Sequence, residues 1–246
     1  MMKQKLAGQR IAVLAADGVE QAELTVPLAA LRAAGAEVEI ISLHDGSIRG
    51  VNMDAPGDSF EVDRTVHEAR ARDYDGLFIP GGFINPDFLR QSSAARDFVR
   101  DFDHQQKPIA TLCHGPWLLA SSGLASGRAL TSWPGVRDDM VNAGATWLDQ
   151  EVVRDGNLLT SRGPQDLVPF IREMLQLYAG GPPSNGALRR RHSDPQREAP
   201  SSFAMAAAHL APRMSAGTMI GLALIGAGML ASGRGNRMGA QQAASR

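Results

Sequence analysis

The stretch PIATLCHGPWLLAS, residues 108–121, contains a short apolar run, a sharp turn and the first turns of a helix. Residues 108–112 predict a buried strand and residues 114–121 a helix, because Pro116 suits a first helical turn, where its missing N–H costs nothing. A residue at such an elbow is lifted from the edge of the sheet, so that its side chain is exposed in a crevice. The residue at this elbow is Cys113, the single cysteine among 246 residues.

Apolar runs and helical patterns alternate on both sides of this elbow, up to about residue 180. The expected strands are 11–14, 38–43, 76–80, 108–112, 129–133 and a hairpin of 147–153 with 158–161 around Asp155-Gly156. The expected helices are 20–34, closed by Gly35, and then 86–102, 114–121, 136–142 and 165–178. This alternation predicts an α/β fold with a mostly parallel central sheet covered by helices on both faces. In such sheets the chemistry collects at the carboxyl ends of the strands.

Composition and charge divide the chain into two parts. Hydrophobic residues make up 43% and charged residues 21%, which excludes a fully disordered or collagen-like chain. Residues 181–246 hold eight arginines and two acids, a net charge of +6, whereas residues 1–180 hold 17 basic and 24 acidic residues, a net charge of −7. The run GGPPSNG at 180–186 is typical of a linker. We therefore predict an α/β domain over residues 1–180 and an accessory tail beyond it.

The tail divides further by composition. Residues 181–213 form a basic segment with Pro, Ser and Ala, which predicts a disordered linker. Residues 214–233 are 20 positions without a charge, a length that can span a bilayer core, and Gly217 and Gly221 have the spacing at which two membrane helices touch. The alternative for 214–233 is a flexible Ala/Gly-rich segment that is too weakly hydrophobic to insert. Residues 234–246 form a polar end.

A single cysteine limits the chemistry of the chain. Cys113 cannot form an internal disulfide or build a cysteine-rich zinc site, and a lone thiol fits a reducing compartment. The N-terminus, MMKQKLAGQR, has no apolar signal core, so we expect a cytoplasmic protein, tethered to a membrane only if residues 214–233 insert. The net charge of −1 excludes a polycation built to bind nucleic acid.

The elbow predicts a reactive thiol. A helix that begins just after Cys113 directs free N–H groups and a partial positive charge toward the sulfur, which favours the nucleophilic thiolate. Gly115 leaves room for a substrate. The alternative interpretation is a buried cysteine that acts as a small hydrophobic residue. The strand–elbow–helix context and the adjacent His114 favour the reactive thiol.

Residues around the elbow could transfer protons and bind an oxyanion. His114 could reach a carboxylate or a substrate, and Asp87 is an available partner for it, unless Asp87 is an ordinary helix N-cap. Gly81 and Gly82 could present backbone N–H groups to a developing oxyanion together with the amide of His114. Two glycines at the end of a strand could also simply form a tight turn.

Glu20 and Glu23 follow the first expected strand, at the start of a helix. Acids in a first turn commonly only balance the helix dipole. One of them could instead lie against Cys113, because we expect the first strand to neighbour the cysteine strand at the centre of the sheet. A buried carboxyl with a raised pKa could then donate a hydrogen bond to the sulfur and act as a general acid or base.

Five segments together resemble the PfpI family, which belongs to the ThiJ/PfpI group of the class I glutamine amidotransferase-like superfamily. They are AADGVEQAE (15–23), PGG (80–82), ATLCHGP (110–116), TSWPGVRDDMVN (131–142) and DGNLLTSRGP (155–164). The resemblance covers about residues 9–179. It implies a flavodoxin-like three-layer sandwich that assembles into homo-oligomers, often dimers or hexamers.

The resemblance also implies roles for four residues. Cys113 corresponds to the nucleophile of the family, His114 to its triad histidine and Glu23 to the glutamate beside the cysteine. Asp87 stands where peptidase members place a triad glutamate, contributed across a subunit interface. The implied activities are those of an intracellular cysteine peptidase, a protein deglycase or a glyoxalase-like hydratase. Their substrates are a peptide, a glycated protein or a small carbonyl compound.

The alternative function is that of a stress-response redox sensor or chaperone-like protein. In that case Cys113 is oxidised rather than turned over, because a low thiol pKa serves both roles. We expect no cofactor and no metal. His67-Glu68 begins like a zinc-peptidase helix but lacks the second ligand, and GAGMLA at 226–231 lacks the following chain and the acid of a dinucleotide-binding unit. The late His-x-Glu pair of glutaminase domains is also missing.

Overall fold

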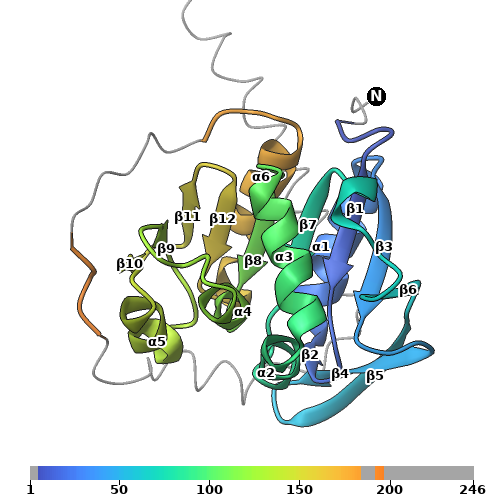
Figure 1. Ribbon diagram of the computed structural model, residues 1–246, viewed down its shortest axis with the longest axis horizontal. Coiled ribbons are helices and arrows are strands. Elements are labelled where there is room, and N and C mark those ends of the chain that lie inside the picture. Colours follow the sequence, from blue (N-terminus) through green and yellow to red (C-terminus); the bar gives the residue numbers. More distant parts are fainter. Residues whose placement is uncertain (1–4, 184–191, 197–246) are drawn as a thin grey trace, which may run out of the picture.

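A seven-stranded sheet runs through the computed structural model, which describes residues 5–183 and 192–196 (Figure 1). In spatial order its strands are β11 (Val152–Asp155), β12 (Leu158–Ser161), β8 (Ile109–Leu112), β7 (Gly76–Ile79), β1 (Arg10–Leu14), β3 (Glu37–Ser42) and β6 (Arg64–Thr65). Every neighbouring pair is parallel except β11 and β12, which form an antiparallel hairpin. The carboxyl ends of the parallel strands therefore meet at one edge of the sheet.

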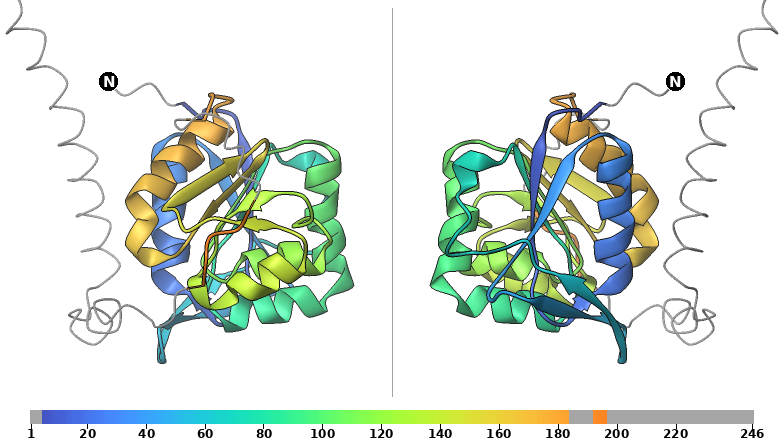
Figure 2. Two further views of the ribbon diagram at one scale, coloured as in Figure 1. Left: turned by 90° about the vertical axis from the view of Figure 1, so that its left-hand side faces the viewer. Right: turned by 90° about the vertical axis from the view of Figure 1, so that its right-hand side faces the viewer.

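Helices cover both faces of this sheet, as the two side views in Figure 2 show. One face carries α1 (Gln21–Ala33) and α6 (Leu167–Tyr178), and the other carries α2 (Ile84–Gln91), α3 (Ser93–His104) and α4 (Pro116–Ser121). The interior strand β1 is apolar on both sides, since Ile11 and Val13 belong to the core under α1 and α6, and Ala12 and Leu14 to the core under α3. The predicted α/β fold with a mostly parallel sheet is confirmed.

A smaller unit lies beside the β11–β12 hairpin. It consists of β9 (Ala129–Leu130), β10 (Thr146–Trp147), the 3-10 turn η2 (Pro134–Val136) and α5 (Arg137–Asn142). Trp147 is fully buried at the centre of its core. This unit borders the end of β8, because the backbone N–H of Trp133 donates to the carbonyl oxygen of Cys113 at 2.8 Å.

The structure corrects four expectations about the elements. The strand expected over 147–153 is divided into β10, which pairs with β9, and β11, which pairs with β12. The single helix expected over 86–102 is two helices, which divide at Ser92, because the Ser92 side chain accepts the backbone N–H of Ala95 and caps α3. Asp87 is therefore no N-cap and lies inside α2, which follows Phe83. The strand β7 lies between β1 and β8, so the first strand does not neighbour the cysteine strand.

A second, three-stranded sheet was not foreseen. It consists of β2 (Val19–Glu20), β4 (Ser47–Asn52) and β5 (Ala55–Glu61), and it lies beside the start of α1. A 3-10 turn, η1 (Ala71–Asp73), precedes β7, and another, η3 (Pro164–Asp166), precedes α6.

Most of the predicted tail, including the apolar segment 214–233 and the polar end 234–246, lies outside the described residues. In the described part of the chain, no helix is long and apolar enough to cross a membrane. Residues 5–183 and 192–196 also contain no group of three or more His, Cys, Asp or Glu side chains placed to hold a metal ion.

Candidate active site

Cys113 lies directly after β8, in the sharp turn that leads to α4. Its φ of 59° is in the left-handed region, which a non-glycine residue occupies only when neighbouring structure holds it there. Two hydrogen bonds hold this backbone, since Cys113 N–H donates to Ser161 O at 3.0 Å and Cys113 O accepts from Trp133 N–H at 2.8 Å. The sulfur lies 3.2 Å from His114 Nδ1, and the residue is 6% exposed. The turn thus aims a nearly buried thiol at the adjacent imidazole.

Glu23 reaches this thiol from α1 although β7 separates the two strands. The Glu23 side chain is fully buried and lies against Cys113 and the backbone of Gly81 and Gly82. Burial and, next, the nearby Glu20 carboxylate raise the pKa of Glu23 to about 8, and the adjacent Cys113 thiol and backbone N–H groups of Gly81 and Gly82 oppose this only in part. At neutral pH the Glu23 carboxyl group is therefore mostly protonated and able to donate a hydrogen bond.

The thiol and the carboxyl group compete for one proton. Burial raises the pKa of Cys113 well above its ordinary value, and the Glu23 carboxylate raises it further, whereas the backbone N–H groups of Gly82 and His114 lower it. Burial thus opposes the thiolate that the elbow alone predicted. Once Glu23 is protonated, the negative charge beside the sulfur is gone and a donor takes its place, which favours the thiolate.

The His114 imidazole contacts two indole rings. The imidazole is stacked on Trp133, with centroids 5.8 Å apart and planes at 21°, and lies 5.3 Å from the Trp117 ring at 57°. Burial lowers the pKa of His114 to about 4, so that the imidazole is neutral at neutral pH and able to accept a proton. Neither tryptophan was singled out by the sequence as part of a site, although Trp133 belongs to the TSWPG segment.

Three glycines shape the space around the sulfur. A side chain at Gly81 would overlap the Glu23 carboxyl group and the Cys113 Cβ. Gly82 has a φ of 85°, and its Cβ position is filled by the backbone of residues 18–20. A side chain at Gly115 would overlap Thr111 and the backbone of β8. Each position therefore requires glycine for packing, and the roles of these residues in binding an oxyanion or substrate stay predictions.

The two acids at the start of α1 have different surroundings. Glu20 points away from the sulfur, to the turn between β4 and β5, where its Oε2 accepts the backbone N–H of Met53 at 3.0 Å. Burial raises the pKa of Glu20 as well. The choice between Glu20 and Glu23, which the sequence left open, thus falls on Glu23 as the residue against Cys113.

Asp87 has a different partner, the Gln91 side chain. It lies on the exposed face of α2, where its carboxylate and its carbonyl oxygen accept hydrogen bonds from the Gln91 side chain. The described residues of the protomer show no hydrogen bond or ion pair between Asp87 and His114. The pairing of these two residues across a subunit interface, which the resemblance implies, stays a prediction.

The fold and the elbow define a class of α/β proteins with a cysteine at the end of a central strand. The sequence pattern of the DJ-1/PfpI family matches residues 9–177. The chain belongs to the DJ-1/PfpI family, which confirms the resemblance described above.

Relatives and solved structures support this assignment. The chain is 42% identical over 168 residues to Deglycase PfpI of Pyrococcus furiosus, a match that covers 68% of this chain and 98% of the relative. It is 41% identical over 171 residues to Protein/nucleic acid deglycase 2 of Escherichia coli, covering 69% and 97%. The crystal structure of Drosophila melanogaster DJ-1beta superposes with a TM-score of 0.63 at 31% identity, covering 70% of this chain and 91% of that one.

Proposed function

We propose that the protein is a cysteine-dependent hydrolase of the PfpI type that acts as a deglycase. The observation that carries this proposal is the Cys113 sulfur, 3.2 Å from a neutral His114 imidazole and beside the buried Glu23 carboxyl group. The relatives named deglycases support the choice of substrate, a glycated protein or nucleic acid.

The proposed reaction begins with attack of the Cys113 thiolate on the carbonyl-derived carbon of the glycated group. In the adduct of an amine with an aldehyde this carbon carries the amine and a hydroxyl group, and the backbone N–H groups of Gly82 and His114 donate hydrogen bonds to the hydroxyl oxygen. As the C–S bond forms, the C–N bond breaks, and the leaving amine takes the proton that Glu23 received from the thiol. The neutral imidazole of His114 then takes a proton from water, whose oxygen attacks the same carbon. The C–S bond breaks, and the sulfur takes the proton from His114, which restores the thiol and releases the hydrated aldehyde.

A peptidase activity at the same site would require a third triad residue from a second subunit. The third member of a triad would be Asp87 of a second copy, because Asp87 and His114 form no hydrogen bond or ion pair within the described protomer. We propose that the protein forms a homo-oligomer, a dimer or a hexamer, through the start of α2. The exposed Phe83 and Phe88, at 53% and 45%, support an interface there.

The experiment compares wild-type protein with Cys113→Ala and Asp87→Asn on two substrates, a peptide amine modified by methylglyoxal and an unmodified peptide. We expect Cys113→Ala to remain folded by circular dichroism and to lose release of the free amine at least about a thousandfold, because no nucleophile remains. Asp87→Asn should retain this activity. Release of amine by Cys113→Ala at the wild-type rate would refute the proposal.

The same samples separate the redox-sensor alternative. A sensor would convert Cys113 stoichiometrically to sulfinate on titration with peroxide, as read by intact mass, without turnover of either substrate. A loss of peptide cleavage in Asp87→Asn would instead assign peptidase chemistry to the oligomer.

A further inference from the structure

Residues 192–196 lie against the domain, beyond the part that matches the family. Figure 1 shows this segment, in orange, beside β10 and α5, and the left view of Figure 2 shows it crossing the same elements. The family match ends at residue 177, so the segment is an addition to the part of the chain that matches the family.

The segment occupies the free edge of β10. On one side of β10, the backbone N–H groups of Thr146 and Leu148 donate to β9 and the residue before it. On the other side, Trp147 N–H donates to Ser193 Oγ at 2.9 Å, and Trp147 O accepts from Asp194 N–H at 2.8 Å. The segment thus satisfies both backbone groups of Trp147 that β9 leaves unpaired, as an added strand does.

Asp194 is the anchor of the segment. Its Oδ2 accepts the backbone N–H of Asp149 at 2.9 Å, and its carbonyl oxygen accepts from Arg137 Nε at 2.8 Å. The Arg137 guanidinium also lies 5.9 Å from the centre of the Trp147 ring. One acidic residue therefore bonds to both α5 and the chain that follows β10.

Two short chains of contacts connect residues 192–196 to Cys113 and His114. In the first, Gln196 Nε2 donates to Pro134 O at 3.2 Å, next to Trp133, which stacks on His114 and donates to Cys113 O. In the second, the Asp149 carboxylate accepts from Arg162 at 2.9 Å, and the neighbouring Ser161 accepts the backbone N–H of Cys113.

We propose that the β10–α5 edge is a binding site for residues 192–196 of this chain, and that this bound segment, here called the strap, holds the Trp133 side chain in place against His114. The strap stabilises the stacked position of His114 over the thiol. Its release would loosen Trp133 and open Cys113 to reagents from solution. This role does not depend on which reaction the site performs.

The experiment uses the full chain and three variants, Asp194→Ala, Asp194→Asn and His192→Ala. Asp194→Ala removes the acceptor of the Asp149 amide, Asp194→Asn keeps a side-chain carbonyl at that place, and His192→Ala is a matched exposed change in the same segment. Hydrogen exchange at the amides of Trp147 and Asp149 measures docking. The rate of Cys113 alkylation by iodoacetamide measures access to the sulfur. Neither readout needs turnover, so the proposal can fail while the proposed function stands.

In Asp194→Ala we expect exchange at both amides to rise about fivefold, the factor that corresponds to losing one hydrogen bond of ordinary strength. Alkylation should accelerate by a similar factor, whereas Asp194→Asn and His192→Ala should match the wild type. Unchanged exchange in Asp194→Ala would show that the segment does not dock and would overturn the proposal. Faster exchange with unchanged alkylation would overturn its second half, the link to the active site.

Discussion

The proton on Glu23 links the chemistry of the site to the stability of the fold. Burial raises the pKa of this carboxyl group from 4.5 to about 8 in the folded state. Between these two values the folded protein keeps the proton and the unfolded chain loses it. Stability from this group is therefore fully present below pH 4.5 and declines as the pH rises toward 8.

We predict that Glu23→Gln, which cannot ionise, stabilises the protein at neutral pH. The free energy of unfolding should exceed that of the wild type by about 3 kcal/mol at pH 7, since each pKa unit between pH 4.5 and pH 7 corresponds to about 1.4 kcal/mol. Near pH 4 the two proteins should be equal. Urea unfolding at pH 4, 6 and 8 measures the difference, with exposed Glu37→Gln as the control. A gain that is the same at every pH would contradict the assigned pKa.

For individual residues, the sequence predicted the position of Cys113 in the elbow but not which side chains surround it. Cys113 and Gly82 follow the ends of strands, so the strand pattern alone brings them to one edge. The choice of Glu23 over Glu20 depends on which way each side chain leaves the start of α1, which a linear pattern does not contain. The contact of Trp133 with His114 depends on the path of the chain between β9 and α5.

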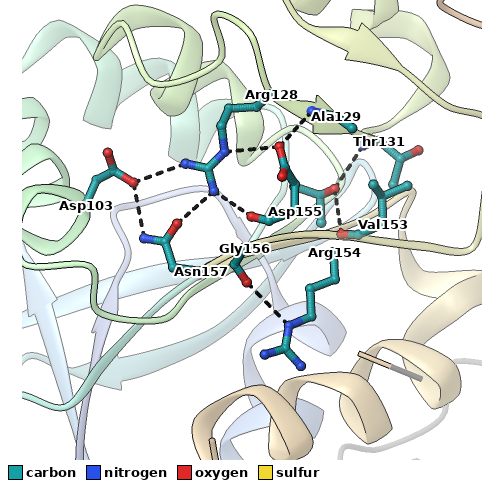
Figure 3. A network of polar contacts seen from close by, with 10 residues as sticks. Asp103, Arg128, Ala129, Thr131, Val153, Arg154, Asp155, Gly156 and Asn157 are labelled. Atoms are coloured by element: carbon teal, nitrogen blue, oxygen red, sulfur yellow. Dashed lines mark hydrogen bonds and ion pairs between the residues drawn. The ribbon is translucent and has the colours of Figure 1, made fainter. Parts of the chain in front are cut away.

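One half-buried cation, Arg128, joins the elements around the start of β12. Figure 3 shows Arg128 among side chains from three elements: it contacts Asp103 of α3 at 3.2 Å, Asp155 of β11 at 3.3 Å and Asn157 in the hairpin turn at 2.8 Å. Its guanidinium therefore connects the small unit to both the sheet and a covering helix.

We predict that Arg128→Ala lowers the free energy of unfolding by about 2 kcal/mol, because several charge-assisted hydrogen bonds are lost and two carboxylates lose their cation. Arg128→Lys should recover part of this, since one ammonium cannot replace the forked contacts. Arg72→Ala is the control, because Arg72 is 80% exposed and lies 3.9 Å from its acidic partner. Urea titration measures all three. Equal losses in the Arg128 and Arg72 variants would contradict the role of this network.

Element prediction succeeded where hydrophobic runs are continuous and failed where they are not. The buried strands β1, β7 and β8 are short apolar runs between glycines, prolines and acids, and all three were predicted. The hairpin of β4 and β5 was missed because most of its side chains are exposed and its pattern is interrupted by Gly50 and Gly57. Both glycines are needed where the two strands and Gln21 approach closely.

For the whole molecule, the exposed start of α2 predicts the state of assembly. Phe83 and Phe88 lie exposed on either side of Asp87 in the sequence, and large exposed aromatic residues are typical of interfaces. We predict that light scattering gives the mass of a dimer or a larger oligomer, and that the double variant Phe83→Ser/Phe88→Ser shifts it toward the monomer. Val168→Ser, at the similarly exposed Val168 on the opposite side of the sheet, is the control. A monomeric wild type would contradict both the interface and an Asp87 contributed across it.

The left-handed backbone at Cys113 imposes a local energetic penalty at the candidate active site. Holding a side chain at this φ costs about 1 kcal/mol or more, and the bonds from Ser161 and Trp133 offset it. At most positions a change from alanine to glycine weakens a protein, yet here glycine would relax the turn that alanine keeps under tension. In a homologue that has lost the cysteine and its chemistry, glycine at this position would therefore be more stable than alanine. A glycine at the corresponding turn of a homologous sequence would thus indicate that the cysteine chemistry has been lost.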